Sequence, residues 1–266
     1  MSLLNEGFEK YKKLNESQAT YYPEGLEEPA RQIFQEVHQA CQLLGKLLGQ
    51  PMPVMNIVLV GTADWQFAPP EQMEDPPGPP GAMLPYWTEV PEPPMLVVPE
   101  QMDEIMGEDT PEKRSLLLYH ELAHAFLEHD PRPWPDDSPL WADEWQLQFA
   151  AFWLFKQIHG QIENITADLH QQFAESFQPE ADGKTPVTVR GFDWYEDTAP
   201  EDYLEFVLLL EKFAADLLAR YDATLLPRFL ARYRSETPLL SEDVTKMLGE
   251  VLGEDGEEWL EELVYF

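Results

Sequence analysis

The stretch His120-Glu121-Leu122-Ala123-His124 is the part of this chain that decides its interpretation. It lies in a segment of helix-forming residues that runs from 114 to 127. On a helix, positions i and i+4 lie one above the other, so both imidazoles project from one face and can bind one zinc ion. Glu121 is turned by about 100° around the axis. Its carboxylate then lies beside the ion, where it can accept a proton from a zinc-bound water. The pattern indicates metal-assisted hydrolysis.

A catalytic zinc site needs three protein ligands and one open position, so two histidines are not enough. Asp130 follows His124 at the distance where metzincin-type sites carry their third ligand. Those sites leave the helix through a glycine, and Leu127 occupies that position here. Leucine resists the left-handed conformation that such a turn often requires. We therefore expect Asp130 to be a solvated residue at the end of the helix.

Glu144 is the stronger candidate for the third ligand. It follows a proline-rich loop at 130–139 and lies in a segment, 140–154, so dense in apolar residues that we predict a buried helix. A carboxylate in the first turn of that helix, between Trp141 and Trp145, needs a partner, and zinc would supply it. Asp143 is the neighbouring residue that could be the third ligand instead of Glu144, although it projects from a different face of the helix. We predict His120, His124 and Glu144 as the metal ligands.

The histidine motif followed by Pro139, Trp141 and Glu144 resembles the gluzincin metallopeptidases, most closely the peptidase MA-like group. That group combines H-E-x-x-H with P-x-W-x-x-E. The resemblance implies an α+β, zincin-like fold with a small mixed sheet, an active-site helix and a mainly helical C-terminal half. In this fold the last strand before the active-site helix is an edge strand, along which an extended peptide can bind. The run Phe149-Ala150-Ala151 is also similar to the ImmA/IrrE-like group, which stays an alternative.

The resemblance implies a zinc-dependent metallopeptidase (a hydrolase with Zn²⁺ as cofactor) in which Glu121 is the general base. Gluzincins commonly place a tyrosine or histidine from the C-terminal part at the oxyanion. Tyr203 and Tyr195 are the candidates here, although Tyr203 also fits a packing role. Trp145 and Gln148 depart from the glycine and the acidic residue of the family pattern. A catalytically silent zinc-binding module, or a regulatory protease that cleaves one protein partner, therefore stays open.

The charge of the chain limits its partners. With 17 basic and 50 acidic residues, the 266-residue chain carries a formal charge of −33. Such a surface repels the phosphates of nucleic acids and anionic lipids, so we expect neither as a partner. The acidic residues are spread along the chain, which favours a role in solubility. The sharper alternative is a basic peptide or protein as substrate. The oligomeric state is left open.

The remaining composition favours a cytoplasmic protein. No apolar run approaches the roughly 18 residues of a membrane-spanning helix. The N-terminus lacks the basic and apolar regions of a secretory signal. The single cysteine, Cys41, excludes an internal disulfide framework and lies on an apolar helix face.

We predict a flexible N-terminal arm at 1–20 and a single zincin-like domain at 21–266. Within that domain we expect an N-terminal α/β part at 21–135 and a helical C-terminal part at 136–266. Thr110 and Pro111 are a suitable cap and first residue for the active-site helix. The other expected elements are helices at 24–50, at 140–154 continuing toward 171, and at 203–221, strands at 54–60 and 95–98, and a proline-rich loop at 68–94 that borders the substrate cleft.

Overall fold

The structure is a computed structural model. It describes residues 8, 10–14, 18–71, 82–132, 134–135, 138–162, 165–173, 187–192, 200–235 and 240–266. The chain divides into two compact units, Met1–His129 and Asp130–Phe266. None of the helices in these described ranges has the length and the continuous apolar character that a membrane-spanning segment needs.

The first unit contains a five-stranded mixed sheet with the strand order β1-β2-β3-β5-β4. The parallel neighbours are β2 with β3 and β3 with β5, and the two outer strands pair antiparallel to their neighbours. The strands are β1 (Lys12–Lys13), β2 (Thr20–Tyr22), β3 (Asn56–Val60), β4 (Tyr86–Thr88) and β5 (Met95–Pro99).

The two central strands, β3 and β5, confirm the predicted strands at 54–60 and 95–98. Both are rich in valine, isoleucine and leucine, and nearly all of their residues are buried. Such continuous apolar runs are typical of parallel strands whose two faces are both covered. Val58, Val60 and Val97 on these strands belong to one hydrophobic cluster, which also includes Phe8.

The prediction for the edge strand was wrong in one respect. The last strand before the helix with the histidine motif, β5, lies inside the sheet, and β4 is the strand at the edge. β4 falls within the segment 68–94 that we expected to be a loop. Its three residues, Tyr86, Trp87 and Thr88, are too few for a period-two pattern to appear beside so many prolines. Residues 72–81 of the proline-rich stretch lie outside the described residues.

The described residues near the N-terminus take part in the sheet, where we expected a loosely attached arm. Lys12 and Lys13 form β1 and pair with β2. Phe8 is buried against β3 and β5. The apolar side chain of Phe8 thus attaches a segment whose other residues are largely polar.

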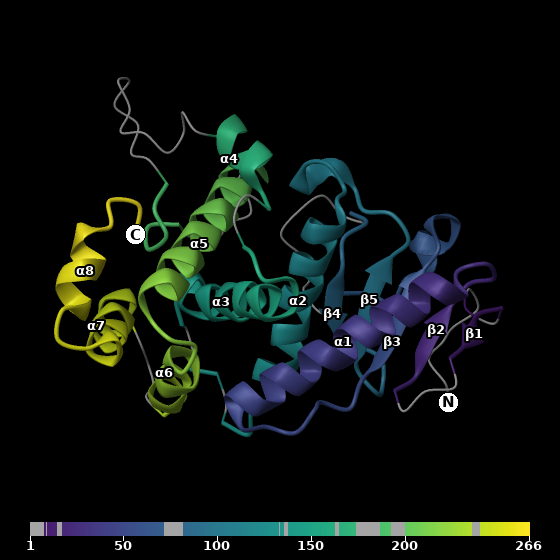
Figure 1. Ribbon diagram of the computed structural model, residues 1–266, viewed down its shortest axis with the longest axis horizontal. Coiled ribbons are helices and arrows are strands. Elements are labelled where there is room, and N and C mark those ends of the chain that lie inside the picture. Colours follow the sequence, from purple (N-terminus) through teal and green to yellow (C-terminus); the bar gives the residue numbers. More distant parts are fainter. Residues whose placement is uncertain are drawn as a thin grey trace. The chain divides into compact units, whose positions relative to one another are not determined.

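Two long helices accompany the sheet in the first unit, and Figure 1 shows α1 running across it. α1 (Glu27–Leu48) buries Phe34, Val37, Cys41 and Leu44, as its spacing predicted, and it ends at Gly49, where φ is 67°. α2 (Pro111–Glu128) contains the histidine motif. The short 3₁₀ segments are η1 (Thr62–Phe67) and η2 (Glu104–Met106).

The described part of the second unit is helical. The helix predicted over 140–154 is confirmed as α3, but it ends at His159 instead of continuing toward 171. Gly160 follows with φ of 85°, a left-handed conformation that ends a helix and that glycine adopts without steric cost. The helices are α3 (Leu140–His159), α4 (Ala167–Gln172), α5 (Pro200–Arg220), α6 (Leu225–Tyr233), α7 (Ser241–Leu252) and α8 (Gly256–Glu262).

The core of the second unit is aromatic. The indole of Trp145 on α3 is fully buried, and its ring centroid lies 4.9 Å from that of Phe229 and 6.3 Å from that of Phe213. These contacts join α3 to α5 and α6 in an edge-to-face geometry that aromatic rings prefer.

The sheet of the first unit and the helices of both units confirm the predicted α+β class with a small mixed sheet.

Candidate functional site

The histidine helix α2 begins as its sequence predicts. The hydroxyl oxygen of Thr110 accepts a hydrogen bond from the backbone N–H of Lys113 at 3.2 Å, and Pro111 occupies the first helical position. The cap satisfies one of the backbone donors that every helix start leaves without an intrahelical acceptor.

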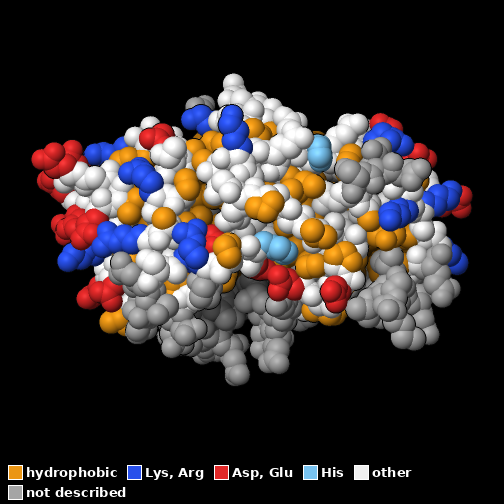
Figure 2. Space-filling view, turned by 90° about the horizontal axis from the view of Figure 1, so that it is seen from below, with side chains coloured by type: hydrophobic (Ala, Val, Ile, Leu, Met, Phe, Trp, Pro, Cys, Tyr) orange, Lys and Arg blue, Asp and Glu red, His pale blue; other side chains and the backbone are white. Residues whose placement is uncertain are grey.

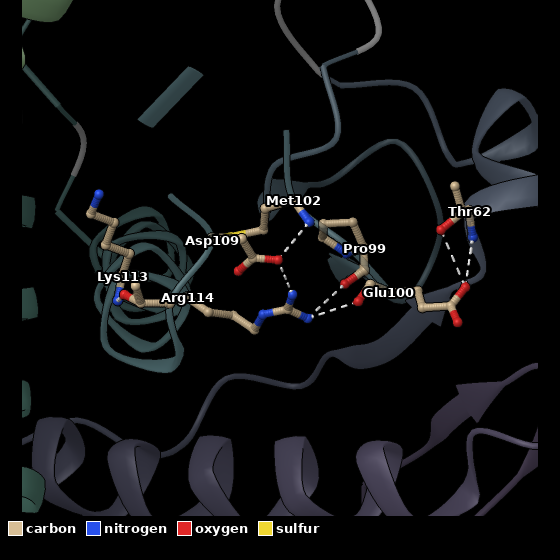
Figure 3. Close-up of polar contacts among 8 residues, drawn as sticks. Thr62, Pro99, Glu100, Met102, Asp109, Lys113 and Arg114 are labelled. Carbon is tan, nitrogen blue, oxygen red and sulfur yellow. Dashed lines mark hydrogen bonds and ion pairs between the residues drawn. The ribbon is translucent and has the colours of Figure 1, made fainter. Parts of the chain in front are cut away.

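Arg114 connects the first turns of α2 to the end of β5 (Figure 3). Its guanidinium donates to the carbonyl oxygen of Glu100 at 2.9 Å and to the carboxylate of Asp109 at 2.5 Å. The carboxylate of Glu100 in turn accepts from the backbone N–H and the hydroxyl of Thr62 at 3.0 and 3.2 Å. This network holds the start of α2 next to the end of β5.

The two histidines of the motif lie together on α2. Their ring centroids are 5.2 Å apart with an interplanar angle of 66°, and both residues are half-buried. Half-burial leaves a ring partly accessible while its neighbours restrict its rotation. The i, i+4 spacing therefore brings two imidazoles together, as expected, and imidazole nitrogen is a preferred ligand of zinc.

Glu121 points to the edge strand. Its Oε2 accepts a hydrogen bond from the backbone N–H of Trp87 on β4 at 2.8 Å. This bond gives the carboxylate a fixed orientation beside the histidine pair. It also ties α2 to the edge strand β4.

A second carboxylate of α2, Glu128, was not predicted as part of the site. Its Oε1 lies 3.4 Å from Nδ1 of His124, and its Oε2 accepts a hydrogen bond from the indole N–H of Trp87 at 2.5 Å. Its spacing of four residues from His124 was a signal in the sequence. The contribution of Trp87 was not, since it depends on how β4 pairs in the sheet.

Glu144 lies near the start of α3 and is half-buried, and Trp141 and Trp145 on the same helix are fully buried. Its neighbour Asp143 has another function. One oxygen of Asp143 accepts from the hydroxyl of Tyr233 at 2.7 Å, and the other accepts from that of Ser138 at 2.6 Å. Both oxygens of Asp143 therefore accept hydrogen bonds from hydroxyl groups of the second unit.

Tyr233 is well suited to hold Asp143. Its ring is fully buried, and this burial, followed by the nearby charge of Asp143, raises the pKa of its hydroxyl far above the usual value. The phenol therefore stays protonated and donates. The bond joins the last residue of α6 to the first turn of α3 and so stabilises the backbone next to Glu144.

Asp130 is not the solvated residue that we expected. Its side chain is 1% exposed, and Oδ1 and Oδ2 accept from Nε and Nη2 of Arg132 at 2.9 and 2.7 Å. These hydrogen bonds lower the pKa of the Asp130 carboxyl. Residue spacing does not predict this pair, because it depends on the conformation of the loop that contains both residues. The bidentate pairing assigns Asp130 a structural role.

A second arginine supports the same loop. Arg234 is buried, its guanidinium lies 3.3 Å from the ring centroid of Trp134, and it donates to the backbone carbonyl of Arg132 at 3.0 Å. Burial lowers the pKa of Arg234 to about 10, so the group is still a cation at neutral pH.

The oxyanion candidates have different outcomes. Tyr195 lies outside the described residues. Tyr203 is half-buried on α5, and its ring centroid lies 6.3 Å from those of Phe192 and Phe206. These neighbours give Tyr203 a place in an aromatic cluster, which fits the packing role considered for it.

The predicted zinc ion requires three protein ligands close together. Among the residues that the structure describes, no group of three or more histidine, cysteine, aspartate or glutamate side chains comes together. The pair on α2 supplies two nitrogen donors of the kind that zinc prefers. The first unit therefore contains two of the three residues that we predicted as zinc ligands, His120 and His124.

On the face drawn in Figure 2, the acidic side chains of the described residues occupy several separate places among basic and apolar ones.

A comparison with models of protein families gives no match, and no curated protein matches the chain.

Proposed function

We propose that the chain is a zinc-dependent metallopeptidase of zincin-like fold, with His120, His124 and Glu144 as the zinc ligands. The observation that carries the proposal is the arrangement on α2. Two imidazoles lie 5.2 Å apart on one helix, and the carboxylate between them in sequence is oriented by the backbone of an edge strand. Hydrolysis of an extended peptide requires these parts together.

Zinc would supply Lewis acidity, which brings the pKa of a water molecule to about 7. Glu121 accepts the proton of the attacking water and delivers it to the amine that leaves. The hydrogen bond from Trp87 N–H holds one oxygen of Glu121, so the carboxylate does not have to be reoriented during the reaction. In this proposal the hydroxyl of Tyr203 donates a hydrogen bond to the oxyanion.

The proposed substrate is an extended peptide that pairs with the edge strand β4. A net charge of −33 would attract basic peptides over long distances at low salt. We also propose that the protein is located in the cytoplasm.

One observation favours the alternative of a silent zinc-binding module. Glu121 ties α2 to β4 through Trp87, so this residue has a structural use even without chemistry. The presence of Glu121 alone therefore does not distinguish an enzyme from a module.

The test compares the wild type with Glu121→Gln. We expect purified wild type to carry about one zinc ion and to cleave members of a mixed peptide library. Glu121→Gln should keep the metal and the fold, because the amide oxygen can still accept the Trp87 N–H. Its cleavage rate should fall at least about 100-fold, since general-base catalysis contributes roughly that much or more.

Glu112→Gln is the matched control, since Glu112 is an exposed carboxylate in the first turn of the same helix. Its cleavage rate should equal that of the wild type. Zinc binding without cleavage of any peptide would favour the module, and cleavage of a single protein partner alone would favour the regulatory protease. Absence of zinc binding would contradict the whole proposal.

A further inference from the structure

We propose that Glu128 and Trp87 are positioning residues, which orient His124 and Glu121 for the metal and the substrate. This inference rests on the proposed function. It concerns two residues that the motif H-E-x-x-H does not include. Its basis is the set of contacts between the last turns of α2 and the edge strand β4.

The first step is the spacing along α2. His120, His124 and Glu128 follow each other at intervals of four residues, so they lie along one face of the helix. Glu121 and Glu128 are separated by about two turns, which brings their carboxylates to the same side. The helix therefore presents the two imidazoles and both carboxylates to neighbouring groups together.

The second step is the environment of Glu128. One oxygen accepts the indole N–H of Trp87 at 2.5 Å, and the other lies 3.4 Å from Nδ1 of His124. A carboxylate held at both oxygens has little rotational freedom. With its Nδ1 beside a carboxylate, the imidazole would bind zinc through Nε2. A carboxylate in this position orients the ring and increases its basicity toward the metal.

The third step is that Trp87 serves both carboxylates. Its backbone N–H donates to Glu121, and its indole N–H donates to Glu128. The residue is 7% exposed, so its side chain is held by packing as well. A single residue of the substrate-binding strand thus sets the orientation of the proposed base and, through Glu128, that of one proposed ligand.

The experiment measures the dissociation constant for Zn²⁺ of the full-length protein, by competition with a chromophoric chelator after removal of bound metal. Glu128→Gln should weaken zinc binding about 10- to 100-fold. Trp87→Phe removes the indole N–H but keeps an aromatic ring and the backbone donor to Glu121. Trp87→Phe should also weaken zinc binding, but by a smaller factor than Glu128→Gln. Glu112→Gln should leave the constant unchanged.

Thermal unfolding of the metal-free proteins separates positioning from a purely structural role. If Glu128 only ties α2 to β4, both variants lower the melting temperature of the metal-free protein and leave the zinc constant unchanged, which overturns the inference. A wild type that binds no zinc overturns the proposed function and this inference together. A wild type that binds zinc no more tightly than Glu128→Gln overturns only the role of Glu128.

Discussion

Asp130 shows how one buried carboxylate makes stability depend on pH. Hydrogen bonds from Arg132 lower its pKa in the folded chain, whereas an unfolded aspartate titrates near pH 3.9. A carboxylate with a lowered folded pKa stabilises the fold at all pH values above its unfolded pKa. That contribution is lost as the pH falls through the unfolded value toward the folded one.

We therefore expect Asp130→Asn to lower the free energy of unfolding at pH 7 by about 1–3 kcal/mol, the range for a hydrogen-bonded charge. The difference from wild type should shrink below about pH 4. Urea unfolding at pH 7 and at pH 3 measures both quantities.

Glu254→Gln is the control for the effect of total charge, because Glu254 is an exposed carboxylate. Removing it should leave the pH dependence almost as in wild type. A penalty for Asp130→Asn that is equally large at both pH values would contradict the assignment to the Arg132 pair.

Single residues also show what spacing can and cannot predict. The pairing of His120 with His124 follows from helix geometry alone and is confirmed. The same geometry would have indicated Glu128, four residues further along. The role of Trp87 depends on a strand of three residues finding its place beside β5, and no local pattern encodes that place.

At the scale of elements, the cap of α2 determines how firmly the histidine helix begins. Thr110→Ala removes the acceptor for the Lys113 N–H. We expect the free energy of unfolding to fall by about 1 kcal/mol. Thr110→Ser keeps the hydroxyl and should stay close to wild type. Denaturant unfolding monitored by far-ultraviolet circular dichroism measures the difference, and equal loss in both variants would argue against the capping bond.

Long amphipathic helices were the best predicted elements, because their buried residues recur over several turns. The predicted helices at 24–50 and 203–221 correspond to α1 (Glu27–Leu48) and α5 (Pro200–Arg220). The predicted continuation of α3 to 171 was wrong. Apolar spacing passes through Gly160 without interruption, but the backbone there adopts a conformation that no helix continues.

At the scale of the whole molecule, the net charge of −33 opposes compaction. Salt screens repulsion between exposed charges, with a Debye length near 10 Å at about 0.1 M. We therefore expect the melting temperature to rise when NaCl is increased from about 10 mM to about 150 mM. Differential scanning calorimetry measures it.

Potassium chloride at equal ionic strength is the control, since screening does not depend on which monovalent cation is present. A rise with one salt only would indicate specific ion binding. A melting temperature that falls with both salts would contradict net repulsion.

Contacts between segments far apart in the sequence were harder to predict than contacts within one helix. Local spacing predicts the histidine pair within one helix. Convergence of distant segments depends on the packing of whole elements, which local spacing does not encode, so the assignment of Glu144 as the third ligand stays a prediction.

The rim of the sheet opposite β4 has its own consequence. β1 consists of two exposed lysines, Lys12 and Lys13, in a chain that has 17 basic residues in all. A further strand added there, from another copy of the chain, would have to pair beside these two charged side chains. Charged lysines on an outermost strand discourage such stacking into ribbons. The β1 edge of the sheet therefore disfavours edge-to-edge pairing between copies of the chain.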